Sequence, residues 1–188
     1  MKKFFLLVAA AVLMAPAASF AQKMTATNIN REKTYQTTQH SVDIWYEGEL
    51  NVGYGFNGKM DGEKVKYGRP FVETVHGVRI TKYAFVGAGL GFQYATNKEL
   101  KTGVMPIFID LKGYYPVSEN LAPYVAIDLG YSAVLTSEFE DLKGGMYASY
   151  GLGLNYKRLN FGLGLQHQGF KDFDKGINSF FLKVGIKF

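Results

Sequence analysis

The sequence predicts an all-β protein, an eight-stranded antiparallel up-and-down β-barrel that crosses a membrane. Beyond about residue 41, apolar side chains recur at every second position, which is the period of a β-strand. Each alternating run is about ten residues long, as a tilted membrane-crossing strand requires. Hydrophobic residues reach 47%, yet after the N-terminal segment no stretch approaches the roughly eighteen consecutive apolar residues of a transmembrane helix. Since only helices and closed barrels satisfy every backbone group in lipid, a membrane location requires a barrel.

The N-terminal residues predict secretion. Two lysines precede an apolar run over residues 4–13, and small residues lead to an expected cleavage site after Ala21. This order is typical of a secretory signal peptide, and the run is too short for a membrane-spanning helix. We therefore exclude residues 1–21 from the fold. Residues 22–41 are polar without an amphipathic period, which predicts a lead-in on the periplasmic side.

The clearest strands form a hairpin between Gly103 and Val134. Ile107 and Ile109 alternate with Phe108 and Asp110 in its first half, and the pattern resumes after PVSEN in its second half. Two alternating runs joined by turn-forming residues predict a hairpin. The other predicted strands have the same period and span 42–56, 71–82, 84–95, 146–156, 159–168 and 179–188.

The predicted connections alternate in length. Long polar connections follow strands one, three, five and seven, whereas short turns follow strands two, four and six. Long external loops and short periplasmic turns are typical of outer-membrane barrels. We therefore predict one barrel domain over 42–188, monomeric and in the cell outer membrane, with any surface ligand bound by the loops 57–70, 136–145 and 170–178.

Composition argues against several other classes of function. The chain has no cysteine, which excludes disulfides, thiolate metal sites and a catalytic thiol. The formal net charge of +5 falls to about +3 once Lys2 and Lys3 are removed, and no basic run suggests a nucleic-acid partner. The three histidines are scattered without a second metal ligand at suitable spacing. We predict no metal and no cofactor.

The inward face of the predicted barrel carries charges of both signs. Unpaired charges in a narrow lumen are costly, so we expect them to pair, with Lys183 near Glu47 or Glu49. Two interpretations stay open: a fixed network of ion pairs that fills the lumen, or a gate whose pairs exchange and admit small ions. The predicted interior network consists of Glu47, Glu49, Glu73, Arg79, Asp110, Lys112, Asp128 and Lys183, with Lys187 on the same face.

Alternating glycines over 87–91 are interleaved with apolar residues inside a strand pattern. A nucleotide-binding loop would need a strand before the glycines and a helix after them, so we interpret these glycines as small residues facing a narrow barrel interior. A soluble barrel of lipocalin type is the structural alternative. It would turn its apolar residues inward, leaving a face rich in glycine and paired charge in water.

An outer-membrane lipid-modifying enzyme is the least favoured functional alternative. Such a site needs a histidine base beside a serine nucleophile, oriented by an acid. His167 is the only candidate base, and its neighbours are Gln166 and Gln168, with no serine two residues away. We therefore predict that the chain is not an enzyme.

The signal peptide, the eight alternating runs and the terminal Phe188 resemble small outer-membrane barrels of the OmpA/OmpX type. The hairpin MPIFIDLKGYYP to LAPYVAIDLGY, followed by GLGLNY and FGLGLQ, resembles the barrel family common in Bacteroidetes. The resemblance implies that the barrel-assembly machinery recognises Phe188 during biogenesis. It also implies contact with outer-membrane lipid and lipopolysaccharide. It implies nothing about activity, so a structural or surface-interaction role is the first hypothesis and a porin-like channel the second.

Overall fold

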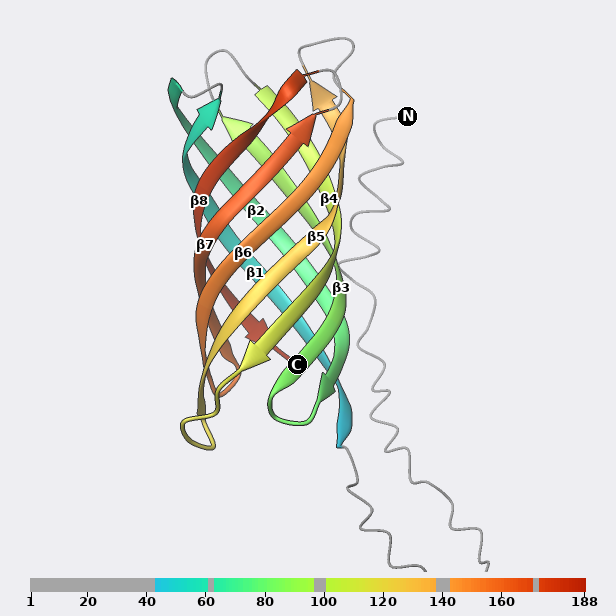
Figure 1. Ribbon diagram of the computed structural model, residues 1–188, viewed down its shortest axis with the longest axis vertical. Coiled ribbons are helices and arrows are strands. Elements are labelled where there is room, and N and C mark those ends of the chain that lie inside the picture. Colours follow the sequence, from blue (N-terminus) through green and yellow to red (C-terminus); the bar gives the residue numbers. More distant parts are fainter. Residues whose placement is uncertain (1–42, 61–62, 97–100, 138–142, 171–172) are drawn as a thin grey trace, which may run out of the picture.

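The computed structural model describes residues 43–60, 63–96, 101–137, 143–170 and 173–188, and the predicted signal peptide and lead-in lie outside them. These residues form a closed barrel in which each strand pairs antiparallel with its neighbours in the chain and β1 pairs with β8 (Figure 1). No described residue belongs to a helix that could span a membrane. The strands are β1 (Ile44–Met60), β2 (Glu63–Ile80), β3 (Ala84–Thr96), β4 (Lys101–Tyr114), β5 (Leu121–Ser137), β6 (Gly144–Tyr156), β7 (Leu159–Phe170) and β8 (Phe173–Lys187).

The eight-stranded fold is as predicted, but the predicted long loops are wrong. Strand pairing continues to Met60 and Glu63, so most of 57–70 belongs to β1 and β2. Most of 170–178 is likewise strand, and 136–145 is shortened from both sides. Apolar alternation marks only the part of a strand that faces an apolar phase, whereas backbone pairing continues into polar sequence. The strands are therefore longer than the alternating runs that predicted them.

The two ends of the barrel differ. The turn end carries the connections 81–83, 115–120 and 157–158 and the C-terminus, and the loop end carries the connections 61–62, 97–100, 138–143 and 171–172 (Figure 1). The predicted alternation of long and short connections is therefore wrong, because strand pairing takes up most of the polar sequence that predicted the long ones. Thr81 and Lys157, in two of the short turns, have positive φ values of 57° and 54°. This left-handed conformation strains residues other than glycine.

Strand register fixes the tilt of the strands. If directly paired residues are followed from strand to strand around the barrel, the path that leaves β1 at Ile44 returns to β1 at Tyr54, ten residues further along the chain. A stagger of ten residues around eight strands tilts them by about 40° from the barrel axis. The circuit passes through Ile44, Ile80, Ala84, Gly113, Val125, Leu152, Leu163, Leu182 and Tyr54.

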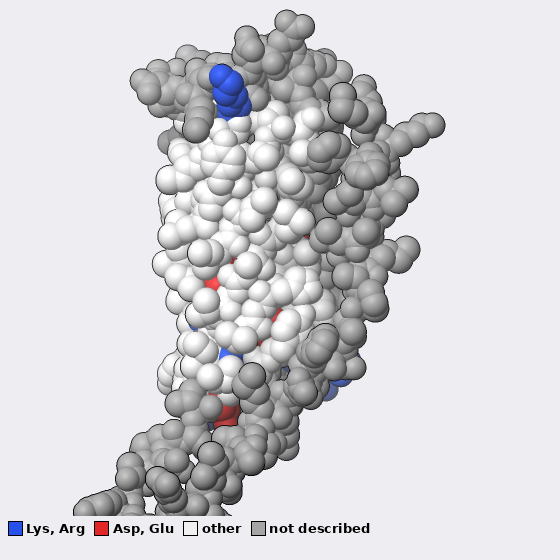
Figure 2. Space-filling view, turned by 90° about the vertical axis from the view of Figure 1, so that its right-hand side faces the viewer, with Lys and Arg blue, Asp and Glu red and all other residues white. Residues whose placement is uncertain are grey.

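The wall is apolar outside and polar inside. Ile109 is 57% exposed on the exterior, whereas the next residue, Asp110, is 0% exposed in the lumen. Leucine, isoleucine, valine and aromatic side chains continue this exterior around all eight strands. On the face shown in Figure 2, charged atoms are sparse between the two ends of the barrel. A soluble barrel of lipocalin type has the opposite polarity.

Inward aromatic rings pack against inward glycines of neighbouring strands. A Cβ added to Gly53 would overlap Phe71, and a Cβ at Gly89 would overlap Phe108. On Gly87, in the predicted glycine run, an added Cβ would lie 2.7 Å from the ring of Phe85, two residues away on the same strand. The glycines therefore provide the space that allows large rings to fill a narrow lumen.

Candidate functional site

The structure buries seven of the eight residues of the predicted charge network inside the barrel, and the eighth, Glu47, is partly buried at the turn end. It also adds a charge that the sequence analysis missed. Arg69, which the sequence analysis assigned to a loop, lies on β2 inside the barrel and is 2% exposed. Its position on the inward face would have been recognised if the alternation of β2 had been extended before Pro70. Among the described interior side chains, five acids thus face five bases.

Lys112 lies at the centre of the network. Its Nζ is 2.6 Å from Glu49 Oε2 and 2.8 Å from Asp110 Oδ2, and the three side chains are fully buried. The same ammonium lies 5.1 Å from the centre of the Phe85 ring. One cation therefore neutralises carboxylates from β1 and β4 without contact with bulk water.

A second ion pair joins β2 to β8. Lys183 Nζ lies 2.7 Å from Glu73 Oε1. This corrects the expectation that Lys183 pairs with Glu47 or Glu49. Lys183 is in register with Gly53, so the stagger of the barrel carries it past Glu47 and Glu49 towards Glu73.

Two asparagines connect these ion pairs. Asn51 Nδ2 donates to Glu73 Oε1 at 3.2 Å and to Glu49 Oε2 at 3.4 Å. Asn160 Nδ2 donates to Glu49 Oε2 at 3.0 Å, and its Oδ1 accepts a hydrogen bond from Tyr124 at 2.5 Å. Hydrogen bonds to charged groups are among the stronger ones in proteins, so the amides hold the carboxylates in place. The sequence analysis did not identify either asparagine.

Glu47 forms the ion pairs nearest to the turn end. Arg79 Nη1 donates to both carboxylate oxygens of Glu47, at 3.1 and 3.2 Å, and Lys187 Nζ lies 2.8 Å from Oε1. The Arg79 guanidinium also stacks on the Tyr114 ring, 3.5 Å from its centre. These groups close the lumen at the turn end.

Asp128 is the last member of the predicted charge network to be placed, and it lies on β5. It pairs in register with Asp110, and Ser149 Oγ donates to its Oδ2 at 2.8 Å. A cavity of about 10 Å³ lies beside Asp128, Ser149 and Lys183. This volume has room for about one water molecule.

Aromatic rings fill the lumen beyond the charges. Phe71 and Phe181 meet edge to face at 6.2 Å, and Phe108 lies 5.4 Å from Tyr147. These four rings come from β2, β4, β6 and β8, so every second strand contributes one ring. Towards the loop end, buried polar side chains bond one another: Arg69 Nη2 donates to Ser179 Oγ at 2.5 Å, and Ser132 Oγ donates to Gln168 Oε1 at 2.7 Å. The described interior is therefore filled from the turn end to this polar layer.

Two histidines interrupt the apolar exterior. His167 Nδ1 lies 2.8 Å from Asn178 Oδ1 of β8, near the loop end. His76 lies between two hydroxyls, with Nδ1 2.6 Å from Tyr46 and Nε2 3.0 Å from Thr74. The sequence analysis did not identify this second histidine with a hydroxyl beside it, because it considered serine alone as a partner. Thr74 also donates to the Glu49 carbonyl oxygen, at 3.2 Å.

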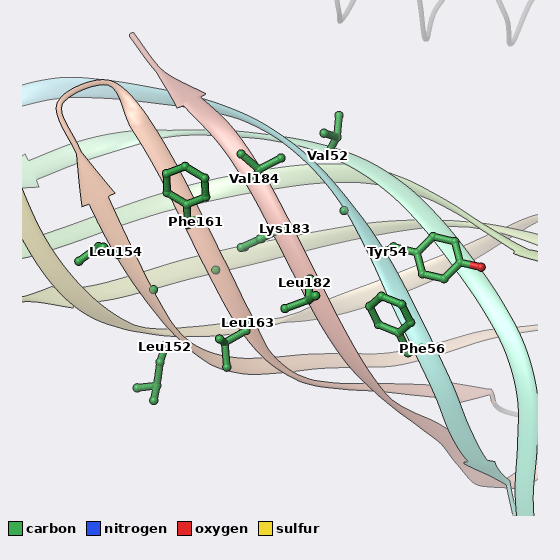
Figure 3. A pocket seen from close by; sticks show the side chains of 13 residues that line it. Val52, Tyr54, Phe56, Leu152, Leu154, Phe161, Leu163, Leu182, Lys183 and Val184 are labelled. Atoms are coloured by element: carbon green, nitrogen blue, oxygen red, sulfur yellow. The ribbon is translucent and has the colours of Figure 1, made fainter.

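A shallow hollow of about 790 Å³ lies on the exterior of β1, β6, β7 and β8. Figure 3 shows aliphatic and aromatic side chains around it. Lys183 also lines it, but its ammonium is in the lumen on Glu73. The side chains that form its apolar rim are Val52, Tyr54, Phe56, Leu152, Leu154, Phe161, Leu163, Leu182 and Val184.

No protein-family model and no curated protein sequence matches the chain. Solved structures do match. Neisserial surface protein A is 11% identical with a TM-score of 0.55, and the match covers 78% of this chain and 99% of that one. The outer membrane enzyme PagL is 15% identical with a TM-score of 0.55, and the match covers 73% of this chain and 98% of that one. The chain therefore has the fold of an eight-stranded outer-membrane β-barrel.

Proposed function

We propose that the protein is a monomeric integral outer-membrane barrel whose interior is a fixed structural core and whose function is a surface interaction at the loop end. The apolar exterior supports a membrane location, since a wall of exposed leucine, isoleucine and valine is stable in lipid rather than in water. An orientation with the turn end in the periplasm is supported by the positions at which the barrel begins and ends, because β1 starts and β8 finishes at the turn end, where the predicted periplasmic lead-in joins the barrel. Outer-membrane lipid and lipopolysaccharide would then surround the wall.

The observation that carries the structural role is the filled lumen. Lys112, Glu49 and Asp110 are fully buried, and the aromatic rings of Phe71, Phe108 and Phe181 lie between them and the polar layer. Ion conduction requires a water-filled path, and exchanging buried ion pairs would expose uncompensated charges. The proposal therefore favours a fixed network over a porin-like gate.

Single-channel recording of residues 22–188 in a planar bilayer tests this choice. The expected result is no discrete openings in the wild type or in Lys183→Gln. Insertion is verified independently by the change in gel mobility between boiled and unboiled samples. Discrete openings whose size changes in Lys183→Gln would refute the fixed network and favour the channel.

The surface role is tested at the loop end. Replacing the connections 138–142 and 171–172 with Gly-Ser linkers of equal length should preserve barrel stability, because the paired strands, the ion pairs and the aromatic layer are untouched. Cells that carry the wild-type barrel should bind to an array of matrix proteins and glycans, and cells with the replaced segments should not. Equal binding by both kinds of cell would contradict a surface role for these segments.

We further propose that the chain is not an enzyme. In the described structure, the Thr74 hydroxyl beside His76 donates to a backbone carbonyl, and His167 has an amide partner. The lipid mass spectrum of cells carrying His76→Ala or His167→Ala should therefore equal that of cells carrying the wild type. A change in acyl pattern in either variant would refute this part of the proposal.

The resemblance to the Bacteroidetes-type family supports a role for Phe188 in assembly. Its backbone N–H donates to the Gly48 carbonyl oxygen at 2.9 Å, and its ring lies edge-on to His76 with the ring centres 6.0 Å apart. Deleting Phe188 should reduce the inserted fraction in cells while the purified protein still refolds in detergent. Unchanged insertion in cells would argue against an assembly signal at this residue.

A further inference from the structure

Two carboxyl groups are neighbours inside the barrel. Asp110 of β4 and Asp128 of β5 are directly paired in register, and both side chains lie in the lumen. Directly paired residues of antiparallel strands have Cβ atoms about 5 Å apart, which brings the two carboxyl groups close together. Asp110 is 0% exposed and Asp128 is 1% exposed, so no bulk water screens the repulsion between them when both are ionised.

Each of these carboxyl groups has an oxygen atom without a hydrogen-bond partner. Ser149 Oγ donates to Asp128 Oδ2 at 2.8 Å, and Lys112 Nζ lies 2.8 Å from Asp110 Oδ2. In the described structure, Oδ1 of each aspartate is buried and has no hydrogen-bond partner. A buried acceptor without a donor is costly. One proton between the two groups would satisfy both Oδ1 atoms, because the protonated oxygen donates and the other accepts.

The carboxylates in this part of the lumen outnumber the cations. Lys112 is shared by two carboxylates, and Lys183 lies 2.7 Å from Glu73. Among the ion pairs between described residues, none includes Asp128. Two carboxylates that share a buried site rarely ionise together unless cations compensate both of them. Between the aromatic rings and the ion pairs of Glu47, the described carboxylates are Glu49, Glu73, Asp110 and Asp128, and the described cations are Lys112 and Lys183.

The groups that face the pair from the other strands are mixed in sign. Glu49 of β1 and Glu73 of β2 oppose a second negative charge on the pair, whereas Lys112 of β4 and Lys183 of β8 favour it. Each lysine also contacts a glutamate, which cancels much of its effect on the aspartates. The remaining described neighbours are uncharged, and they are Gly87 of β3, Tyr124 of β5, Tyr147 and Ser149 of β6, and Gln166 of β7.

We propose that Asp110 and Asp128 share one proton and form a carboxylic acid–carboxylate pair at a pH at which an exposed aspartate is ionised. An exposed aspartate loses its proton at about pH 4, so at about pH 6 the lumen retains a proton that water would otherwise take. The proton enters from water as the barrel assembles and lies between the two Oδ1 atoms. This inference concerns the core of the barrel and does not depend on a surface ligand at the loop end.

The surroundings favour a proton over a metal ion. A calcium ion takes about six to eight oxygen ligands, whereas the described residues contain no group of three or more His, Cys, Asp or Glu side chains that could hold a metal. The cavity beside Asp128 is only about 10 Å³ and is also lined by Lys183. A metal ion there would lie near an ammonium group in a low dielectric, which is unfavourable. A proton requires neither additional ligands nor additional space.

Infrared spectroscopy of residues 22–188 at about pH 6 tests the proposal. A protonated carboxyl group has a C=O stretching band that is separate from the amide and carboxylate bands and shifts in heavy water. The barrel is refolded in an alkyl maltoside, a detergent without ester carbonyls, and folding is verified by gel mobility. The test variants are Asp110→Asn and Asp128→Asn, and the control is Glu47→Gln, which removes an interior carboxylate outside the pair.

The wild type and Glu47→Gln should show the protonated-carboxyl band, and both aspartate variants should lack it. In each aspartate variant, the new Asn Nδ2 donates to the remaining carboxylate in place of the shared proton. A wild type without the band would overturn the proposal without reference to any variant. A band that persists in either aspartate variant would also overturn it, because the proton would then not be shared. Loss of the band in Glu47→Gln would instead assign the proton to Glu47.

Proton release on unfolding provides a second measurement. At about pH 6, unfolding of the wild type in urea should release about one proton per chain more than unfolding of Asp128→Asn, because both aspartates ionise once they are exposed. A pH-indicator dye in weakly buffered solution measures the difference, and equal release by the two proteins would overturn the proposal. A wild type without the infrared band whose urea midpoint rises in sodium chloride but not in choline chloride would replace the proton with a sodium ion.

Discussion

Lys112 shows how individual residues stabilise this barrel. Its ammonium lies between Glu49 and Asp110, and all three groups are fully removed from water. Burying one ion is costly, and the cost is offset only while its partners remain. The residue therefore matters less for the attraction it adds than for the two carboxylates that it keeps neutralised.

Replacing Lys112 with Met should destabilise the barrel by about 3–5 kcal/mol, because two buried carboxylates lose their cation. The free energy of unfolding can be measured in urea with the barrel in lipid vesicles. The double variant Lys112→Met/Glu49→Gln should be more stable than Lys112→Met alone, since one orphaned charge is removed. A Lys112→Met barrel as stable as the wild type would show that water reaches the network.

Gly89 offers a test of the ring-on-glycine packing. An added Cβ overlaps the Phe108 ring, so Gly89→Ala should cost about 2 kcal/mol through overpacking. Gly113→Ala is the matched control, because its Cβ would meet only Val125, at 3.5 Å, and it should change stability by less than about 0.5 kcal/mol. Equal effects in the same urea assay would contradict the packing explanation.

At this scale, the sequence predicted which side chains face inward but not which of them pair. Alternation along a strand determines the face, and this was sufficient to place Glu73, Asp110 and Lys183 in the lumen. The partner depends on the stagger between strands, which no pattern within one strand encodes. Alternation therefore predicts Lys183 near Glu47 or Glu49, whereas it pairs with Glu73.

At the scale of secondary structure, the strands extend beyond the apolar pattern that predicted them, and the connections between them are correspondingly shorter than predicted. The third strand was predicted almost to the residue, because both of its ends coincide with changes in polarity. The ends of β1 and β2 were not predicted, because most of the polar residues from 57 to 70 still form backbone pairs between the two strands. A pattern of alternating polarity indicates which part of a strand faces an apolar environment, whereas the ends of a strand are set by its backbone hydrogen bonds.

The two-residue turn between β6 and β7 stores conformational strain. Lys157 has a φ of 54°, which costs an L-residue about 1–2 kcal/mol and costs glycine almost nothing. Lys157→Gly should therefore raise the free energy of unfolding by about 1 kcal/mol. Arg158→Gly is the control and should lower it, since Arg158 is not among the described residues with positive φ. Equal decreases in the free energy of unfolding in Lys157→Gly and Arg158→Gly would rule out strain at Lys157.

The whole molecule is a wall around a dry, charged core. Surface ion pairs weaken as salt screens them, whereas buried pairs are screened much less. In the described interior, Lys112, Glu49 and Lys183 are all buried, and Asn51 and Asn160 connect their ion pairs. The charges should therefore behave as one structural unit rather than as independent contacts.

Stability should consequently depend weakly on ionic strength. Between about 0.05 and 1 M sodium chloride, the urea midpoint of the wild type should stay nearly constant, because ions do not enter the core. A variant with a hydrated core, such as Phe71→Ser/Phe108→Ser, should lose stability as salt increases. A wild-type midpoint that falls as steeply as that of the variant would contradict a dry core.

The stagger of the barrel also determines when its charges are neutralised. Glu73 lies on the second strand, and the lysine that contacts it, Lys183, lies on the last. An incomplete sheet therefore leaves Glu73 without its cation near one edge and Lys183 without its carboxylate at the other. This pair is neutralised only when the two edges of the sheet meet, so electrostatics distinguishes a finished cylinder from an open one and disfavours an open sheet in lipid.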